Sequence, residues 1–435
     1  MKVVILGAGE SGVGAAILAH KKKYEVFVSD GGAIKENFKK ELNKLYIPFE
    51  EEKHTRERIY NTDLIVKSPG IPDHIELIQT AIEKGIPVIS EIEFASKHTD
   101  AVIIGITGSN GKTTTTKLIY HLLHTAGWDV DIGGNVGFSF AKLLASTHRD
   151  YYVLELSSFQ LDGIEDFRPN IAVLLNITPD HLDRYDYQIG NYIESKFRII
   201  RNQRSKDLFV YNALDENMAN WLEGKKLKPE TIAVRNDHFQ DNQLTPDDQS
   251  YFQTKKCSLK GPHNMFNAIC AIHVAKHLGI ADEFIQKGLD TFINAPHRLE
   301  SVATINGVEY INDSKATNVD AVYFALKAMD QPVTLIFGGK DKGNDYTPIH
   351  ELIKEKVKAI ICLGVDNKKI KEAFASTIDI IEETQSTIEA VQMARNLTQP
   401  GEVVLLSPAC ASFDLFKNYE DRGDQFKRAV LDLIE

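Results

Sequence analysis

At residues 101–106 the apolar run AVIIGI leads directly into the glycine-rich segment TGSNGKTTTT. A buried strand that enters such a turn and then a helix directs backbone N–H groups and the positive end of a helix dipole at phosphate oxygens. The strict P-loop pattern requires glycine where this chain has Ile106, so the match is to the tighter variant T-G-x-N-G-K-T. The segment predicts an ATP-binding turn in which Lys112 contacts the β- and γ-phosphates and Thr113 binds Mg²⁺. The residues expected at ATP in this turn are Gly108, Asn110, Gly111, Lys112, Thr113 and Thr114.

A second glycine-rich turn, GAGESG, occupies residues 7–12 and follows the apolar run VVIL. In the pattern G-x-G-x-x-G, Gly7 and Gly9 let the backbone approach a diphosphate, and Gly12 allows close packing of the helix. Asp30 ends the next strand-like run, where a carboxylate can meet the sugar or base of a nucleotide. These residues alone leave open a nicotinamide dinucleotide, a different nucleotide diphosphate and a turn without a ligand.

Short β-branched runs alternate with helix-like segments along the chain, which predicts parallel α/β sheets. The pattern restarts at residue 101 and again after Ala295-Pro296, so we expect three consecutive α/β domains with boundaries 1–96, 97–295 and 296–435. The first and third would be Rossmann-like, and the central one P-loop ATPase-like with a mostly parallel sheet. A length of 435 residues agrees, because single cores stop growing at about 250–300 residues.

Strands are expected at 3–6, 25–28, 63–66, 87–89, 101–106, 151–156, 171–177, 308–314, 332–339, 359–364 and 402–408, and helices at 12–23, 75–84, 190–202 and 267–280. The polar, turn-rich residues 236–250 are expected to form an excursion from the central domain.

The composition excludes several classes of protein. A net charge of −11 argues against a nucleic-acid-binding surface, because nothing would offset the repulsion of phosphates. Four cysteines lie far apart without C-x-x-C spacing, which is typical of isolated thiols in a reducing compartment. No apolar run approaches the length of a membrane span, and VVIL is too short for a signal peptide. We expect a cytoplasmic protein with no nucleic-acid or membrane partner.

Further motifs follow in order along nearly the whole chain, and together they resemble the Mur ligases. They include VLELSSFQLD (153–162), NITPDHLDRY (176–185), GPHNMFNA (261–268), NDSKATN (312–318) and SPACASFDLFKNYEDRGDQF (407–426). The last two are the most specific and are most similar to the members that add D-glutamate. The resemblance implies an ADP-forming acid–amino-acid ligase that joins D-glutamate to UDP-N-acetylmuramoyl-L-alanine in peptidoglycan precursor synthesis. We expect the protein to be a monomer. The first glycine turn would hold the UDP of the substrate and the second would hold ATP.

Such a ligation requires activation, because a carboxylate and an amine form only a salt at neutral pH. Transfer of the γ-phosphoryl group of ATP to the carboxylate gives an acyl phosphate, from which the attacking amine expels phosphate. Cations that clamp the transferring group stabilise the transition state. Glu155 ends the run YYVLEL, where its oxygens suit Mg²⁺; a capping or salt-bridged glutamate is the alternative.

The resemblance extends the metal site to two Mg²⁺ ions held by Thr113, Glu155, His181 and Lys196. It makes Lys196 a carbamylated lysine, which is a carboxylate-like ligand and removes the repulsion between an ammonium and two metal ions. From the residues alone, His181 would be a loop histidine and Lys196 a lysine on a solvated helix face.

The resemblance also assigns residues to ATP in and near the third domain. Asn264 and Asn267 would lie near the adenine, although helix capping is an equally good reading of their spacing. Arg298 would approach the ATP phosphates and Asp313 the ribose, so the third domain would have to close on the central one.

The two remaining groups of residues belong to the substrates. The UDP-substrate group is Gly9, Ser11, Asp30, Ser68, Asn135, Ser157 and Gln160, and the D-glutamate group is Lys315, Thr317, Lys342, Ser412 and Tyr419. Lys315 joins Lys112, Glu155, His181 and Lys196 as a catalytic candidate. Tyr419 stands where the family commonly has phenylalanine. Glu10 is unusual inside a phosphate-binding turn, so we expect its side chain to point towards the uracil or solvent.

Three other classes stay open on sequence grounds. One is a non-catalytic nucleotide-binding scaffold, against which the intact Lys112, Glu155 and His181 argue. Folate polyglutamyl ligases share the central ATP-binding scheme but begin directly at the P-loop, whereas this chain has a Rossmann-like domain before it. An NAD-dependent oxidoreductase with an attached ATPase is supported only by GAGESG and Asp30.

Overall fold

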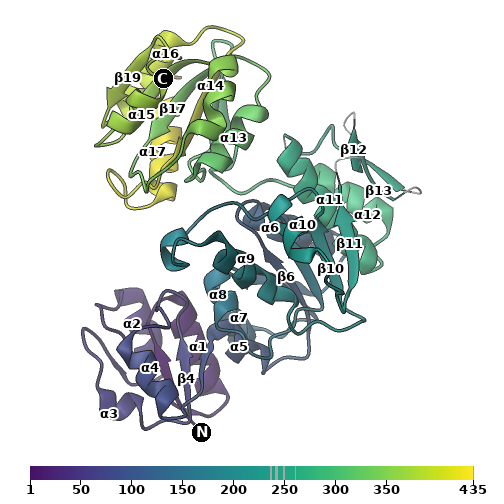
Figure 1. The fold of residues 1–435 in the computed structure, drawn as a ribbon, viewed down its shortest axis with the longest axis vertical. Coiled ribbons are helices and arrows are strands. Elements are labelled where there is room, and N and C mark those ends of the chain that lie inside the picture. The colour runs from purple at the N-terminus through teal and green to yellow at the C-terminus, as the bar shows by residue number, and fades with distance from the viewer. Residues whose placement is uncertain (236–237, 241–242, 248–249, 260, 435) are drawn as a thin grey trace. The chain divides into compact units, whose positions relative to one another are not determined.

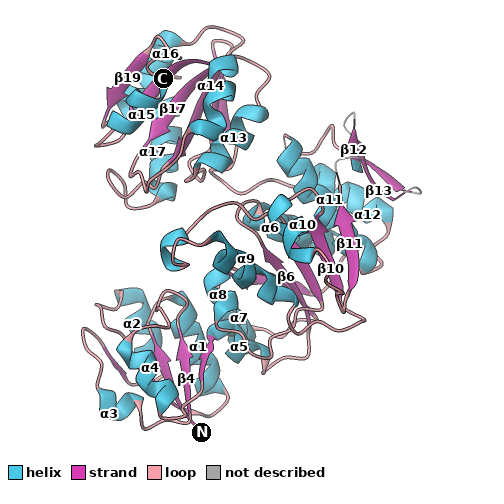
Figure 2. Cartoon of the chain, in the orientation of Figure 1, coloured by secondary structure: helices cyan, strands magenta, loops and turns pink. Residues whose placement is uncertain are grey.

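The computed structural model describes residues 1–235, 238–240, 243–247, 250–259 and 261–434. Figures 1 and 2 show α/β architecture throughout, which confirms the predicted fold class of three α/β domains with parallel sheets. The chain divides into two compact units, Met1–Gln253 with Asn267–Leu289, and Thr254–Phe266 with Asp290–Glu435. The first unit contains the N-terminal and central sheets. The boundaries 1–96, 97–295 and 296–435 stay a prediction.

The N-terminal sheet has five parallel strands in the order β3-β2-β1-β4-β5. The strands are β1 (Lys2–Leu6), β2 (Glu25–Ser29), β3 (Phe49–Glu50), β4 (Leu64–Lys67) and β5 (Val88–Ser90), and the helices are α1 (Glu10–Lys21), α2 (Glu36–Lys44), α3 (Arg56–Ile59) and α4 (Glu76–Glu83). Strand order reverses at β1, and in such sheets the crevice beyond the carboxyl end of that strand is where nucleotides bind. The GAGESG turn lies at this point.

The central sheet has six parallel strands in the order β11-β10-β9-β6-β8-β7. The strands are β6 (Val102–Thr107), β7 (Val130–Gly134), β8 (Tyr151–Glu155), β9 (Ile171–Leu174), β10 (Leu208–Asn212) and β11 (Glu230–Val234). The helices are α6 (Lys112–Thr125), α7 (Phe140–Ser146), α8 (Ser158–Asp162), α9 (Ile189–Phe197), α10 (Glu216–Leu222), α11 (Pro262–His277) and α12 (Asp282–Thr291), with 3-10 turns η1 (Leu182–Arg184) and η2 (Arg198–Ile200). The predicted parallel sheet is confirmed, and β6 and β8 pair so that their carboxyl ends lie side by side.

The excursion at 236–250 is a small antiparallel sheet of β12 (Phe239–Gln240), β13 (Gln243–Asp247) and β14 (Ser250–Gln253). Residues 236–237, 241–242 and 248–249 of that prediction lie outside the described residues.

The second unit contains a six-stranded sheet in the order β15-β16-β20-β17-β18-β19, in which only β15 is antiparallel to its neighbour. The strands are β15 (Glu300–Ile305), β16 (Val308–Asn312), β17 (Val333–Gly338), β18 (Val357–Leu363), β19 (Ile381–Thr384) and β20 (Val403–Ala409). The helices are α13 (Val319–Lys327), α14 (His350–Lys356), α15 (Lys368–Phe374), α16 (Thr387–Leu397) and α17 (Tyr419–Leu431), with a 3-10 turn η4 (Thr347–Ile349). Hydrophobic clusters pack α13 to α15 on one face and α16 and α17 on the other. The parallel strands β16, β17 and β20 therefore end at one edge, where their loops meet.

Helix α5 (Glu91–Ser96) joins the first two sheets, and α1, α5 and α7 share one hydrophobic core. Two glutamates of α5 are buried in this junction. Glu93 Oε2 accepts the N–H groups of Glu165, Asp166 and Phe167 at 2.9, 3.0 and 2.7 Å. Glu91 Oε1 accepts the N–H of Ala141 at 2.5 Å, whereas its Oε2 has no hydrogen-bond partner among the described residues. Burial raises the pKa of Glu91 to about 8.

The raised pKa of Glu91 predicts a stability that falls as the pH rises. The unfolded carboxyl titrates near 4.5, and the folded one keeps its proton up to about 8, so its contribution is full below pH 4.5 and is lost on the way to pH 8. Glu91→Gln cannot ionise but can still accept the Ala141 N–H. We expect its melting temperature to depend less on pH between 5 and 9 than that of the wild type, measured by calorimetry beside the exposed-site control Glu36→Gln. Parallel pH curves for Glu91→Gln and the wild type would contradict this prediction.

Within the described part of the chain, no helix is both long and apolar enough to cross a membrane. The prediction of isolated thiols is confirmed, because all four cysteines lie in the described part of the chain, are buried and form no disulfide: Cys257, Cys270, Cys362 and Cys410.

Candidate active site

The TGSNGKTTTT segment forms the turn between β6 and α6, as predicted. Gly111 adopts a φ of +85°, and a Cβ there would lie 2.6 Å from Asn267 Oδ1, so a side chain cannot be accommodated. The N–H groups of Ser109 and Asn110 donate to the backbone and side-chain oxygens of Asn176 at 2.9 and 2.7 Å. These bonds fix the shape of the turn at the start of α6. The structure therefore brings Asn267 to the P-loop, while Asn264, one turn earlier on α11, belongs to the second unit.

Two lysine amines converge on one carbonyl of this turn. Lys112 Nζ donates to the oxygens of Gly108 and Ser109 at 2.7 and 2.8 Å, and Lys196 Nζ, from α9, donates to Gly108 at 2.9 Å. Lys196 is only 1% exposed, so its interpretation as a lysine on a solvated helix face is wrong.

Burial, with the charge of Lys112 adding to it, holds the pKa of Lys196 well below its usual value. A lowered pKa favours the neutral amine, which is the form that can react with CO2 to give a carbamate. The environment of Lys196 thus fits the predicted modification.

Glu155 ends β8 and is buried beside the P-loop strand. Its Oε1 accepts Asn135 Nδ2 at 2.8 Å, and its Oε2 is buried with no hydrogen-bond partner in the described ranges. A buried carboxylate oxygen without a partner is costly, and a bound cation would remove that cost. No ion pair of Glu155 occurs among the described residues, so the salt-bridge alternative has no support.

His181 lies in the loop before η1, half-exposed, with a φ of +53°. Its ring contacts that of Phe159 at 5.2 Å between centroids, and its Nε2 lies 3.7 Å from an Asp180 oxygen. No group of three or more His, Cys, Asp or Glu side chains in the described part of the chain is placed to hold a metal ion. The predicted set contains only two such residues, so Thr113, a modified Lys196 and ATP would have to complete it.

The first glycine turn is also held in a fixed shape. A Cβ at Gly7, where φ is +89°, would lie 2.6 Å from Ser68 Oγ, and one at Gly12 would lie 1.8 Å from the Gly7 oxygen. The two oxygens of Asp30 accept the N–H groups of Ala8 and Gly32 at 2.6 and 2.8 Å. The structure thus brings Asp30 and Ser68 to this turn, where sequence placed them, and shows that Asp30 shapes its backbone. Gly9 and Ser11 lie at the start of α1.

Three further residues predicted for the UDP-substrate form hydrogen bonds with side chains near them in the central domain. Ser157 and Gln160 form a capping box at the start of α8, and Asn135 contacts Glu155. Glu10, expected to point towards the uracil or solvent, is part-exposed and directs its carboxylate towards α7, where Oε1 accepts the Ser139 N–H at 3.3 Å and Oε2 lies 3.5 Å from Lys142 Nζ. A role towards the uracil stays a prediction.

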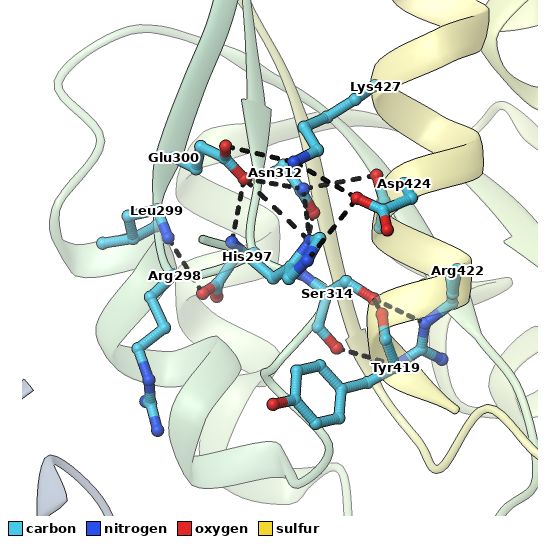
Figure 3. Close-up of polar contacts among 12 residues, drawn as sticks. His297, Arg298, Leu299, Glu300, Asn312, Ser314, Tyr419, Arg422, Asp424 and Lys427 are labelled. Carbon is cyan, nitrogen blue, oxygen red and sulfur yellow. Dashed lines mark hydrogen bonds and ion pairs between the residues drawn. The ribbon is translucent and has the colours of Figure 1, made fainter. Parts of the chain in front are cut away.

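In the second unit, Lys315 Nζ lies 3.7 Å from the centroid of the Tyr419 ring, so two residues predicted for D-glutamate are in contact. Ser412 is buried in the loop after β20, and Thr317 and Lys342 are exposed in the loops after β16 and β17. Asp313 is buried, accepts the Leu299 N–H at 3.2 Å and the Ser407 hydroxyl at 2.9 Å, and has its pKa raised to about 7 by burial. Arg298 extends away from this cluster in Figure 3.

Arg422, which the sequence did not single out, connects these loops (Figure 3). Its guanidinium is 1% exposed and donates to Ser314 Oγ and O at 2.9 and 2.8 Å and to Cys410 O at 3.1 Å. The Gly338 oxygen lies 3.5 Å away, and Ser314 Oγ donates to Tyr419 O at 2.8 Å. One side chain thus ties together the loops that carry Lys315, Lys342, Ser412 and Tyr419. Arg422 is the fourth residue of α17, and a charged residue at such a position gave no sign of its burial.

Comparison with known proteins matches all three parts of the chain. Residues 2–77 match the MurD N-terminal domain, 106–275 the Mur ligase middle domain, and 297–410 the Mur ligase glutamate ligase domain. The UDP-N-acetylmuramoylalanine–D-glutamate ligase of Christiangramia forsetii is 52% identical over 99% of each chain. That of Porphyromonas gingivalis is 49% identical over 99% of this chain and 98% of its own.

Two solved structures show the same fold at low identity. The UDP-N-acetylmuramate–alanine ligase MurC of Thermotoga maritima gives a TM-score of 0.63 at 18% identity over the whole of both chains. The folylpolyglutamate synthase of Mycobacterium tuberculosis gives 0.57 at 14% identity, covering 77% of this chain and 92% of its own.

The chain therefore belongs to the Mur ligase family, a class of ATP-dependent ligases built from three α/β domains. The two relatives that are about 50% identical to it are UDP-N-acetylmuramoylalanine–D-glutamate ligases. Their similarity extends over the N-terminal domain, which argues against a folate ligase, and the oxidoreductase alternative is wrong.

Proposed function

We propose that this protein adds D-glutamate to UDP-N-acetylmuramoyl-L-alanine, with conversion of ATP to ADP and phosphate, in the synthesis of peptidoglycan precursors. The observation that carries this function is the 52% identity over 99% of the chain to a ligase named for that reaction. We further propose that the protein acts in the cytoplasm as a monomer.

ATP binds at the turn of residues 108–114, with Lys112 released from Gly108 and Ser109 to reach the β- and γ-phosphates. Support for this role comes from the fixed backbone of the turn and from the contact of Asn267 with Gly111. Asn264, Arg298 and Asp313 complete the nucleotide site when the third domain closes.

Thr113, Glu155, His181 and a carbamylated Lys196 would hold two Mg²⁺ ions. When bound, these ions supply positive charge to the phosphoryl group and to the oxygens it joins. Asn135 fixes one Glu155 oxygen at 2.8 Å and leaves the other unpaired, so the carboxylate is oriented before a ligand arrives. Burial lowers the pKa of the Lys196 amine and so favours the neutral form, which can react to give the carbamate.

The UDP diphosphate binds at the first glycine turn, where Gly9, Ser11 and Ser68 surround the start of α1 and Asp30 holds the backbone. Ser157, Gln160 and Asn135 would contact the muramyl part, in addition to their local partners. D-Glutamate binds at Lys315, Thr317, Lys342, Ser412 and Tyr419, because cations and hydroxyls supply the paired donors that a dicarboxylate requires. Its free amine then attacks the acyl phosphate.

Phosphate release from ATP tests this function. The enzyme is given UDP-N-acetylmuramoyl-L-alanine and, in separate reactions, D-glutamate, L-glutamate, L-lysine or L-alanine, with Lys112→Ala as the inactive control. We expect release with D-glutamate only. Equal release with L-lysine or L-alanine would assign the protein to a different member of the family.

A further inference from the structure

Glu10 belongs to the first glycine turn, yet its carboxylate serves a different part of the molecule. It accepts the N–H of Ser139, which is the N-cap residue of α7, and lies 3.5 Å from Lys142 in the first turn of the same helix. The same lysine is 2.9 Å from Glu41 of α2. The negative charge of Glu10 is thus directed at a helix N-terminus and a cation, both of which stabilise it.

The backbones of α1 and α7 are in close contact beside this bond. A Cβ at Gly14 would lie 2.0 Å from Ser139 Oγ and 3.1 Å from Lys142 Cβ, so the helices meet where α1 has no side chain. The N–H of Ala141, in the first turn of α7, donates to Glu91, which lies outside that helix. The carboxylate of Glu10 and the carboxyl group of Glu91 therefore fix the start of α7 at two points.

The segment before α7 continues to the ATP-binding region. Gly134 N–H donates to Phe138 O at 3.0 Å, which closes the loop 134–138. Within this loop Asn135 bonds Glu155 twice, through its N–H to the backbone oxygen at 2.9 Å and through Nδ2 to Oε1 at 2.8 Å. A continuous series of contacts thus connects Glu10 with Glu155 by way of Ser139 and Asn135.

We propose that Glu10 is a positioning residue, which fixes the start of α7 and the Asn135 loop against the first glycine turn. This inference rests on the proposed function, in which the turn holds the UDP diphosphate and Glu155 serves the ATP site. The inference also explains why a turn that binds a diphosphate can contain a carboxylate. The negative charge of Glu10 is directed at Ser139 and Lys142, within the domain junction.

Steady-state kinetics of three variants test the inference. Glu10→Ala loses the bond to Ser139, and we expect its KM for UDP-N-acetylmuramoyl-L-alanine to rise about tenfold, together with the Mg²⁺ concentration for half-maximal rate. Glu10→Gln keeps an oxygen that can accept the Ser139 N–H, so its values should stay within about twofold of the wild type. Glu41→Ala is the matched control, because it removes a carboxylate from Lys142 without touching Ser139, and it should also stay within about twofold.

Each other outcome contradicts the inference. A lower KM in Glu10→Ala would mean that the carboxylate only repels the diphosphate. An unchanged KM would mean that the carboxylate has no effect on substrate binding. Equal increases in Glu10→Ala and Glu41→Ala would assign the effect to Lys142, and an increase in Glu10→Gln would assign it to charge instead of position. If Glu10→Ala does not fold, the KM values of Glu10→Gln and Glu41→Ala still show whether the position of the side-chain oxygen or its negative charge matters. Failure of the proposed function itself would be distinct, since the wild type would then release no phosphate with D-glutamate.

Discussion

Replacing Lys196 by alanine is expected to abolish ligation, lowering kcat by about a thousandfold, the size of effect seen when one group that stabilises transition-state charge is removed. Lys196 is buried beside Lys112 with its pKa well below the usual value, and its amine lies on the P-loop at Gly108. A carbamate there would place a negative group beside Lys112 and the turn that begins at Gly108. Alanine at residue 196 supplies no such negative group.

A small carboxylate such as acetate should restore part of the activity of Lys196→Ala, because it can enter the space left by the side chain. The wild type and the control Lys206→Ala, an exposed lysine of the same unit, should not respond to acetate. The measurement is phosphate release at increasing acetate concentration. Normal ligation by Lys196→Ala would remove Lys196 from the site, and loss of activity without any restoration would contradict the carbamate.

Arg422→Met is expected to raise the KM for D-glutamate about a hundredfold and to lower the free energy of unfolding of the second unit by about 3 kcal/mol. The guanidinium holds Ser314 and Cys410, and methionine of similar volume would leave their buried oxygens without donors. Burial lowers the pKa of Arg422 to about 10, so the side chain is still charged near neutral pH. Arg422→Lys should be intermediate, because one ammonium cannot reach acceptors on several loops.

The control for Arg422 is Arg428→Met, an exposed arginine on the same helix. Denaturant titration measures stability, and kinetics measure KM for each substrate separately. The KM values for ATP and for the UDP-substrate should change by less than about threefold in Arg422→Met. Equal increases for all three substrates would show a general loss of structure instead of a specific effect on the D-glutamate loops.

The sequence predicted the parts of the fold that depend on local patterns. Gly7 and Gly111 are favoured by their positive φ angles, and Gly12 by its contact with the Gly7 oxygen of the same turn. These local requirements allowed the two glycine-rich turns to be found without knowledge of the tertiary structure. The strand and helix runs gave the α/β class for the same reason. Strands β3, β7, β10, β11, β15 and β19 were missed. The two-residue β3 and the glycine-containing β7 have no long apolar run, whereas β10 (LFVYN) was overlooked despite one.

The residues that sequence misjudged depend on contacts from distant elements. Lys196 is polar and helical, and only the packing of α9 against the P-loop buries it. Glu10 could not be placed until α7 was known to lie beside α1. Arg422 has no local pattern that separates it from a surface arginine, since its partners come from loops far away in the sequence.

The central claim is that the first glycine turn binds the UDP-substrate and the P-loop binds ATP. A crystal structure with UDP-N-acetylmuramoyl-L-alanine and a non-hydrolysable ATP analogue tests it most directly. We predict the uridine diphosphate at residues 7–12 and the triphosphate at residues 108–114, with Lys112 on the β- and γ-phosphates. The two ligands in exchanged positions, or a first turn that stays empty at saturating substrate, would contradict the account.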